Sequence, residues 1–127
     1  MSAEIISVST SKVYCLRGEL GAGKTTLTNH MLKTIGASEL GTSPTFSIVN
    51  QYHNKDGNLL AYHLDCYRLE SDIEALDIGM EDYLNADCYV FIEWPERIES
   101  LLPLQRTEIS INTISLKTRE ITLVNLP

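Results

Sequence analysis

The chain lacks several features that would assign it to a class at once. No apolar run approaches the roughly 20 residues needed to cross a bilayer, so no membrane span is expected. The first ten residues carry neither a basic segment nor an apolar core, so we expect no signal peptide. Cys15, Cys66 and Cys88 are odd in number and form no C-x-x-C pair. This argues against a disulfide framework or a zinc ribbon, and it favours reduced core thiols and a cytoplasmic location.

Positive charge is also scarce. The sequence has 10 Lys and Arg against 17 Asp and Glu, a formal net charge of −7. Neutralisation of phosphates supplies most of the non-specific affinity for nucleic acid, so an acidic chain is a poor binder of RNA or DNA by itself. No basic run exceeds two residues, which also excludes a polybasic membrane patch. We therefore expect any role on nucleic acid to depend on a partner protein.

The 127 residues are otherwise of ordinary globular composition, 43% hydrophobic and 21% charged. Without a repeat or linker, they predict one domain over residues 1–127. Apolar periodicity and turn residues predict strands at 12–16, 46–52, 59–67, 88–92, 108–114 and 119–124. They predict helices at 24–35, 71–79, 80–84 and 95–102. This order predicts an α/β fold: a mostly parallel sheet flanked by helices, with antiparallel hairpin strands added.

The clearest motif is GELGAGKT at residues 18–25, which fits G-x-x-x-x-G-K-[ST] at every fixed position. It follows a predicted strand and opens a predicted helix, where unpaired backbone N–H groups attract phosphate. Lys24 would place its charge on the β- and γ-phosphates of ATP, and the Thr25 hydroxyl would ligate Mg²⁺. The expected nucleotide-binding residues are Gly21, Ala22, Gly23, Lys24, Thr25 and Thr26. The alternative is a glycine-rich helix start without a ligand.

Two acids and a threonine downstream are candidates for the chemistry. Glu93 directly follows the apolar run 88–92, where P-loop proteins carry a second Mg²⁺ anchor. Asp65 lies on the polar face of a predicted strand and is suited to orienting a water molecule. Thr45 follows the P-loop helix, where switch segments sense the γ-phosphate. Each of the three residues also has a structural alternative. Glu93 would be an ordinary acid at the end of a strand, Asp65 would pair with Arg68 or cap a turn, and Thr45 would lead into a strand.

Four blocks, in this order, resemble the TsaE family of bacterial P-loop ATPases. They are residues 18–26, 43–46, 63–69 and 93–96, with the sequences GELGAGKTT, SPTF, HLDCYRL and EWPE. The resemblance runs from about residue 13 to residue 124. It implies a Mg²⁺-dependent ATPase required for threonylcarbamoyladenosine modification of tRNA. It also implies TsaD and TsaB proteins as partners, with tRNA engaged only through that complex.

The resemblance also assigns roles to single residues. Thr25 and Glu93 would hold the metal, and Asp65 would act in nucleotide handling. Thr45 would be the switch residue, and Arg119 would touch the nucleotide. Family members commonly carry a strand and a helix before the P-loop strand, and these help to enclose the adenine. Only about a dozen residues precede that strand here, so we expect the helix to be missing and the N-terminus to be shorter than usual.

Two other functions remain open at this point. A small P-loop phosphotransferase would need an arginine-rich lid, whereas the five arginines here are spread along the chain. A non-catalytic binding module would use ATP only to order a partner surface. Transfer of label to an acceptor would identify the first, and absence of phosphate release would identify the second.

Overall fold

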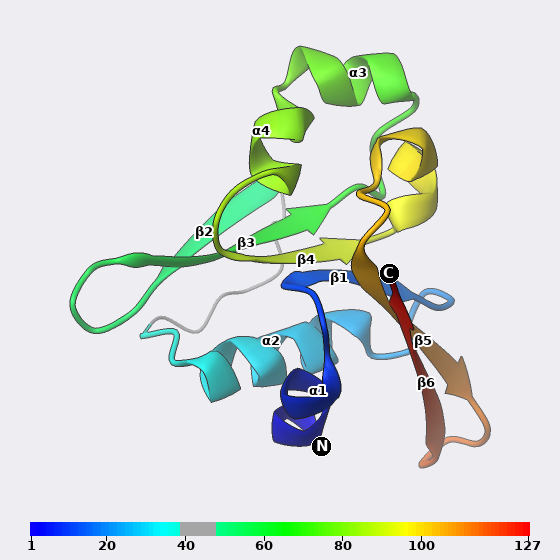
Figure 1. Cartoon of the computed structure of the whole chain (residues 1–127). Coiled ribbons are helices and arrows are strands. Elements are labelled where there is room, and N and C mark those ends of the chain that lie inside the picture. Colours follow the sequence, from blue (N-terminus) through cyan, green and yellow to red (C-terminus); the bar gives the residue numbers. More distant parts are fainter. Residues whose placement is uncertain (39–47) are drawn as a thin grey trace.

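The computed structural model describes residues 1–38 and 48–127, which form a six-stranded sheet with helices on both faces (Figure 1). The elements in chain order are α1 (Ser2–Val8), β1 (Val13–Arg17), α2 (Lys24–Ile35), β2 (Val49–His53), β3 (Leu59–Asp65), α3 (Asp72–Asp77), α4 (Met80–Leu84), β4 (Tyr89–Glu93), the 3₁₀-helix η1 (Pro95–Leu101), β5 (Arg106–Thr113) and β6 (Arg119–Leu126). Within the described ranges, no helix combines the length and apolarity that crossing a membrane requires.

The sheet order is β2-β3-β4-β1-β5-β6. Strands β3, β4, β1 and β5 pair in parallel, and β2 and β6 add antiparallel edges through hairpins. The predicted α/β fold with a mostly parallel sheet is therefore confirmed. Because parallel strands end at one edge of the sheet, the carboxyl ends of β1, β3 and β4 meet there, the edge where open α/β sheets bind ligands.

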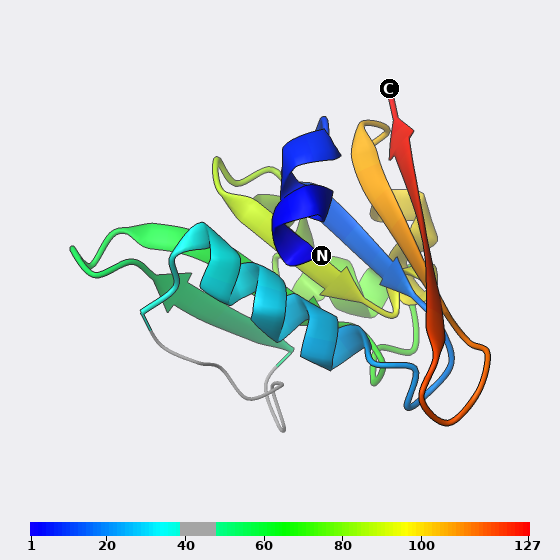
Figure 2. The ribbon, with the colours of Figure 1, turned by 90° about the horizontal axis from the view of Figure 1, so that it is seen from below.

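Two hydrophobic cores lie on opposite faces of the sheet. Figure 2 shows α1 and α2 over one face, where Leu27 and Met31 of α2 pack against Tyr14 and Leu16 of β1. On the other face, α3, α4 and η1 cover a core that contains Cys15. Alternate residues of β1 thus enter opposite cores, as strand geometry requires. All three cysteines are free and buried, as expected, and burial raises the pKa of Cys66 to about 12.

Most element boundaries agree with the sequence predictions within a few residues. Helix α2 has the predicted bounds and ends at Gly36, which adopts the left-handed conformation with φ 104°. The predicted strand 46–52 is found as β2, Val49–His53; residues 46 and 47 lie outside the described residues. The last two strands differ from their predicted ranges, 108–114 and 119–124, because their hairpin pairs from Arg106 with Leu126 to Thr113 with Arg119. Strand β5 therefore begins earlier than predicted, and β6 ends later.

The expectation of a missing N-terminal helix is wrong. Residues Ser2–Val8 form α1, which contacts α2 and buries Ile5 in the core beside Leu27 and Met31. Ile5 is the single buried residue of this seven-residue helix. A helix this short is marginal by itself and gives no periodic apolar pattern, so its stability comes from packing on α2.

Candidate functional site

The loop between β1 and α2 is shaped by its glycines. Gly21 and Gly23 have φ values of 83° and 105°, a region that side chains strongly disfavour. Gly18 is confined by close approach, since a Cβ atom there would lie 2.8 Å from the carbonyl oxygen of Ile111. No side chain caps the N-terminus of α2. The backbone N–H groups of its first turn are therefore available to an anion.

Lys24 holds its ammonium group at the centre of this loop. The residue is 5% exposed, and its Nζ donates to the carbonyl oxygens of Gly18 at 2.5 Å and Glu19 at 3.4 Å. Nζ also lies 3.7 Å from the ring centroid of Trp94. Burial lowers the pKa of Lys24, and the carboxylate of Glu93 opposes that shift. The cation is thus held by acceptors that a phosphate oxygen can replace.

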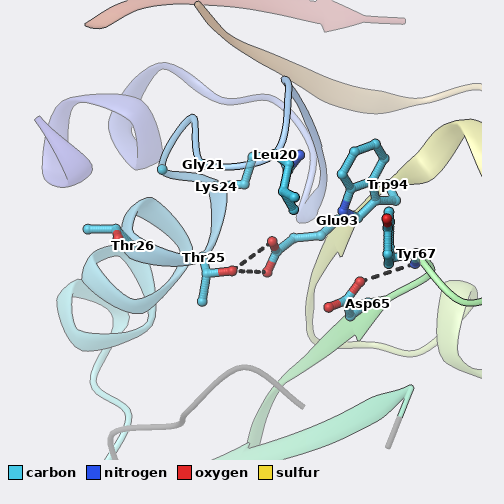
Figure 3. Close-up of a pocket in the computed structure, with 10 residues that line it drawn as sticks. Leu20, Gly21, Lys24, Thr25, Thr26, Asp65, Tyr67, Glu93 and Trp94 are labelled. Carbon is cyan, nitrogen blue, oxygen red and sulfur yellow. Dashed lines mark hydrogen bonds between the residues drawn. The ribbon is translucent and has the colours of Figure 1, made fainter. Parts of the chain in front are cut away.

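Glu93, the last residue of β4, faces the first turn of α2. The Thr25 hydroxyl donates to both of its carboxylate oxygens, at 2.8 and 3.0 Å (Figure 3). Glu93 is 3% exposed, and its Oε2 also lies 2.5 Å from Nε2 of His63. A hydroxyl and a carboxylate in contact are hard oxygen donors of the kind Mg²⁺ prefers. The pair formed by Thr25 and Glu93 fits a magnesium site.

A cage of three or more His, Cys, Asp or Glu ligands is not found within the described residues. Magnesium keeps several waters and usually takes one or two protein groups together with substrate phosphates.

Asp65 ends β3 directly beside Glu93. The two residues are register partners in the parallel pairing of β3 with β4. Oδ1 of Asp65 accepts a hydrogen bond of 3.1 Å from the backbone N–H of Tyr67, so Asp65 caps the turn that follows the strand. Asp65 therefore has the turn-capping role that was its structural alternative. Its side chain also borders the cavity described next (Figure 3).

A cavity of about 370 Å³ opens beside the P-loop, and we call it the polar cavity because its walls carry the charged groups of Lys24, Asp65 and Glu93. Its walls are Leu20, Gly21, Gly23, Lys24, Thr25, Thr26, Asp65, Tyr67, Glu93 and Trp94. Trp94 has left-handed backbone angles, φ 58° and ψ 50°, and its ring lies 4.8 Å from that of Tyr67. Trp94 forms the wall of this cavity next to Lys24.

An apolar cavity of about 470 Å³ lies between the P-loop, α2 and the β5–β6 hairpin, with Met1 at its border. Its walls are Met1, Gly21, Ala22, Gly23, Thr26, Leu27, His30, Ile111, Leu116, Lys117, Arg119 and Ile121. Nε of Arg119 donates to the carbonyl oxygen of Ala22 at 3.2 Å. This hydrogen bond connects the hairpin to the P-loop backbone.

The structure thus distributes the predicted site residues over two adjoining cavities. Lys24, Thr25, Asp65 and Glu93 line the polar cavity, Ala22 and Arg119 line the apolar one, and both cavities are bordered by Gly21, Gly23 and Thr26. Thr45 lies outside the described residues. The contact between His63 and Glu93 is a feature of the site that the sequence does not predict. The only available signal was that His63 and Asp65 share one face of a strand.

Comparison with known proteins places the chain in one family. The profile of "Threonylcarbamoyl adenosine biosynthesis protein TsaE" matches residues 1–121. The chain is similar to two proteins named "tRNA threonylcarbamoyladenosine biosynthesis protein TsaE". It is 40% identical to the one from Bacillus subtilis over 110 residues, covering 87% of this chain and 67% of that protein. It is 46% identical to the one from Haemophilus influenzae over 88 residues, covering 69% of this chain and 54% of that protein.

The chain is also similar to a protein of solved structure. The crystal structure of YdiB from Bacillus subtilis superposes with a TM-score of 0.71 at 33% identity. The superposition covers 91% of this chain and 68% of that one. The matched profile covers nearly the whole chain, and the P-loop, the two strand-end acids and the sheet order accompany it. The chain therefore belongs to the TsaE family of threonylcarbamoyl adenosine biosynthesis proteins.

Proposed function

We propose that this protein is a Mg²⁺-dependent ATPase subunit for threonylcarbamoyladenosine modification of tRNA. It acts in the cytoplasm with TsaD and TsaB proteins and engages tRNA only through their complex. One observation carries the nucleotide part of this proposal. Lys24, Thr25 and Glu93 converge at the uncapped N-terminus of α2, so a cation, a hydroxyl and a carboxylate surround the place where backbone N–H groups attract phosphate.

The two cavities suggest how ATP lies along the P-loop. Phosphates belong on the side of the polar cavity, where Lys24 neutralises the β- and γ-oxygens. The adenine belongs in the apolar cavity, whose aliphatic side chains suit a neutral ring. Met1, the N-cap residue directly before α1, also borders that cavity. Arg119, which donates to the carbonyl oxygen of Ala22 in the P-loop, would contact the nucleotide.

The residues have distinct parts in hydrolysis. When bound, Mg²⁺ supplies positive charge that stabilises the transferring phosphoryl group. Thr25 and Glu93 would hold the ion, and Lys24 would stabilise charge on the phosphate oxygens. Asp65, beside Glu93 on the next strand, would orient the attacking water. Thr45 would act as the γ-phosphate switch.

A phosphotransferase is a weaker candidate. Such an enzyme closes arginines over the transferred phosphoryl group, and no arginine lines the polar cavity among the residues that the structure describes. A non-catalytic module remains a distinct outcome of the experiment below, because it would bind ATP without releasing phosphate.

The test combines binding and turnover. Trp94 lies against Lys24, so ATP binding should change its fluorescence, and Mg²⁺ should strengthen the response. Phosphate release is then measured with and without TsaD and TsaB, and we expect slow turnover alone and faster turnover with both partners. ATP binding without phosphate release in either condition would indicate a binding module. Equal rates with and without partners would contradict activation.

A further inference from the structure

His63 is the buried group that the proposed function leaves without a role. It lies on β3, two residues before Asp65, and its side chain is fully buried. Its Nε2 lies 2.5 Å from Oε2 of Glu93, on the neighbouring strand β4. Glu93 is thus held from two sides, by the Thr25 hydroxyl from α2 and by the imidazole from the sheet.

The hydrogen-bonding capacities assign the proton in this contact. An ionised carboxylate can only accept, so Nε2 of His63 carries the proton and donates it to Glu93. Nδ1 of His63 is buried and has no hydrogen-bond partner among the described residues. The ring also lies 6.5 Å from that of Tyr52, in surroundings that include Phe91.

Packing alone does not account for a histidine at this place. A buried polar atom without a partner costs free energy, and a purely apolar side chain of similar size would avoid that cost. A hydrogen bond from Nε2 to a carboxylate is charge-assisted, and it offsets the free-energy cost of burying Nδ1 without a hydrogen-bond partner. The interaction with Glu93 is therefore what distinguishes histidine from a hydrophobic residue here.

We propose that His63 is a positioning residue for the magnesium site: it orients the Glu93 carboxylate so that its oxygens face the first turn of α2. This inference rests on the proposed role of Glu93 as a metal anchor. Groups that hydrogen-bond a ligating carboxylate commonly change metal affinity by 10–100-fold when removed, because they fix the orientation of the ligand. His63 acts through Glu93 and touches neither nucleotide nor metal.

The experiment compares four variants in the full chain. His63→Met keeps an unbranched side chain of similar length but has no donor. His63→Gln can place an amide N–H near the position of Nε2, whereas the shorter amide of His63→Asn cannot reach Glu93. His53→Met, at the end of β2, is the matched control. Mg²⁺ is titrated into each ADP-bound protein, Trp94 fluorescence is recorded, and ADP affinity and melting temperature are measured in EDTA.

We expect His63→Met and His63→Asn to raise the Mg²⁺ concentration at half-saturation by about 10–100-fold. His63→Gln should recover most of the loss, and His53→Met should equal the wild type. ADP affinity in EDTA should be the same for the wild type and all four variants. If His63→Met fails to fold, the Mg²⁺ affinities of His63→Gln and His63→Asn are compared instead, and weaker Mg²⁺ binding in His63→Asn alone supports the positioning role. Wild-type Mg²⁺ affinity in both His63→Met and His63→Asn, with only a lower melting temperature, overturns the positioning role alone. If the wild type shows no Mg²⁺ effect on ADP binding, the proposed function and this inference both fail.

Discussion

The two cavities beside the P-loop differ in the kind of side chain that lines them. The polar cavity contains both candidate carboxylates, Asp65 and Glu93, together with Lys24, whose Nζ lies 3.7 Å from the ring centroid of Trp94. Among the described residues, the walls of the apolar cavity include no acid, and their charged side chains are Lys117 and Arg119. One glycine-rich loop therefore separates a region suited to metal and phosphate from a region suited to a neutral ring. The contrast predicts that substitutions on the two sides will affect different parts of the same ligand.

The largest effect is expected for Lys24→Ala. Removing a buried cation that pairs with phosphate typically costs 2–5 kcal/mol, so affinity for ATP should fall on the order of a thousandfold. Inorganic triphosphate should lose affinity equally, because Lys24 contacts phosphate and not the base. Fluorescence titration of Trp94, supported by calorimetry, measures both. Lys33→Ala, at an exposed position of the same helix, is the control. Unchanged affinity in Lys24→Ala would refute the P-loop assignment.

Glu93→Gln should have the next largest effect, this time on turnover. The amide keeps the size of the side chain and can still accept from Thr25, but it lacks the negative charge that anchors Mg²⁺. A loss of several kcal/mol in transition-state stabilisation corresponds to a several-hundredfold slower release of phosphate. ATP affinity in EDTA should stay near the wild-type value, and Glu81→Gln on α4 should behave as wild type. A lower melting temperature with normal turnover would make Glu93 a structural residue.

Asp65→Asn should separate hydrolysis from binding within the polar cavity. An asparagine oxygen can still cap the turn at Tyr67, so the fold should be retained. It is a much weaker base, so phosphate release should slow about a hundredfold while affinity for ATP with Mg²⁺ changes little. Single-turnover phosphate release and fluorescence titration give the two values. Full activity would leave Asp65 only its turn-capping role.

Leu116→Ser tests the apolar cavity and should have the smallest effect. Leu116 is 97% exposed, so replacing it should not disturb the fold. Loss of about 1 kcal/mol of apolar contact corresponds to about fivefold weaker binding of ATP. Affinity for inorganic triphosphate should be unchanged. Leu104→Ser, at a position that is 84% exposed and outside both cavities, is the control. An equal loss for ATP and triphosphate would exclude the base from this cavity.

Local patterns in the sequence predict the elements and the P-loop well. The bounds of α2 follow from apolar residues at helical spacing and from Gly36, and Ser71 caps α3 by accepting from the N–H of Glu74, as the capping-box spacing indicates. Glu93 could be chosen because it follows an apolar strand. Each of these features depends on residues close together in the chain.

Features that depend on strand order could not be predicted. The contact between His63 and Glu93 exists because β3 lies beside β4, and periodicity does not specify which strands are neighbours. The apolar cavity has the same origin, since Met1, the P-loop and α2 come from the first part of the chain and the β5–β6 hairpin from its last part. Helix α1 was missed because packing on α2, rather than a repeating pattern, stabilises it.

The register of β3 with β4 limits where this chain can tolerate insertions and deletions. Asp65 and Glu93 lie level with each other, and one added residue inside either strand would turn its acid to the opposite face. Extra residues in the 54–58 turn would leave both acids in place, because that turn lies at the far end of β3. We therefore expect deep insertional scanning to find tolerated sites in the turns and none within 61–65 or 89–93.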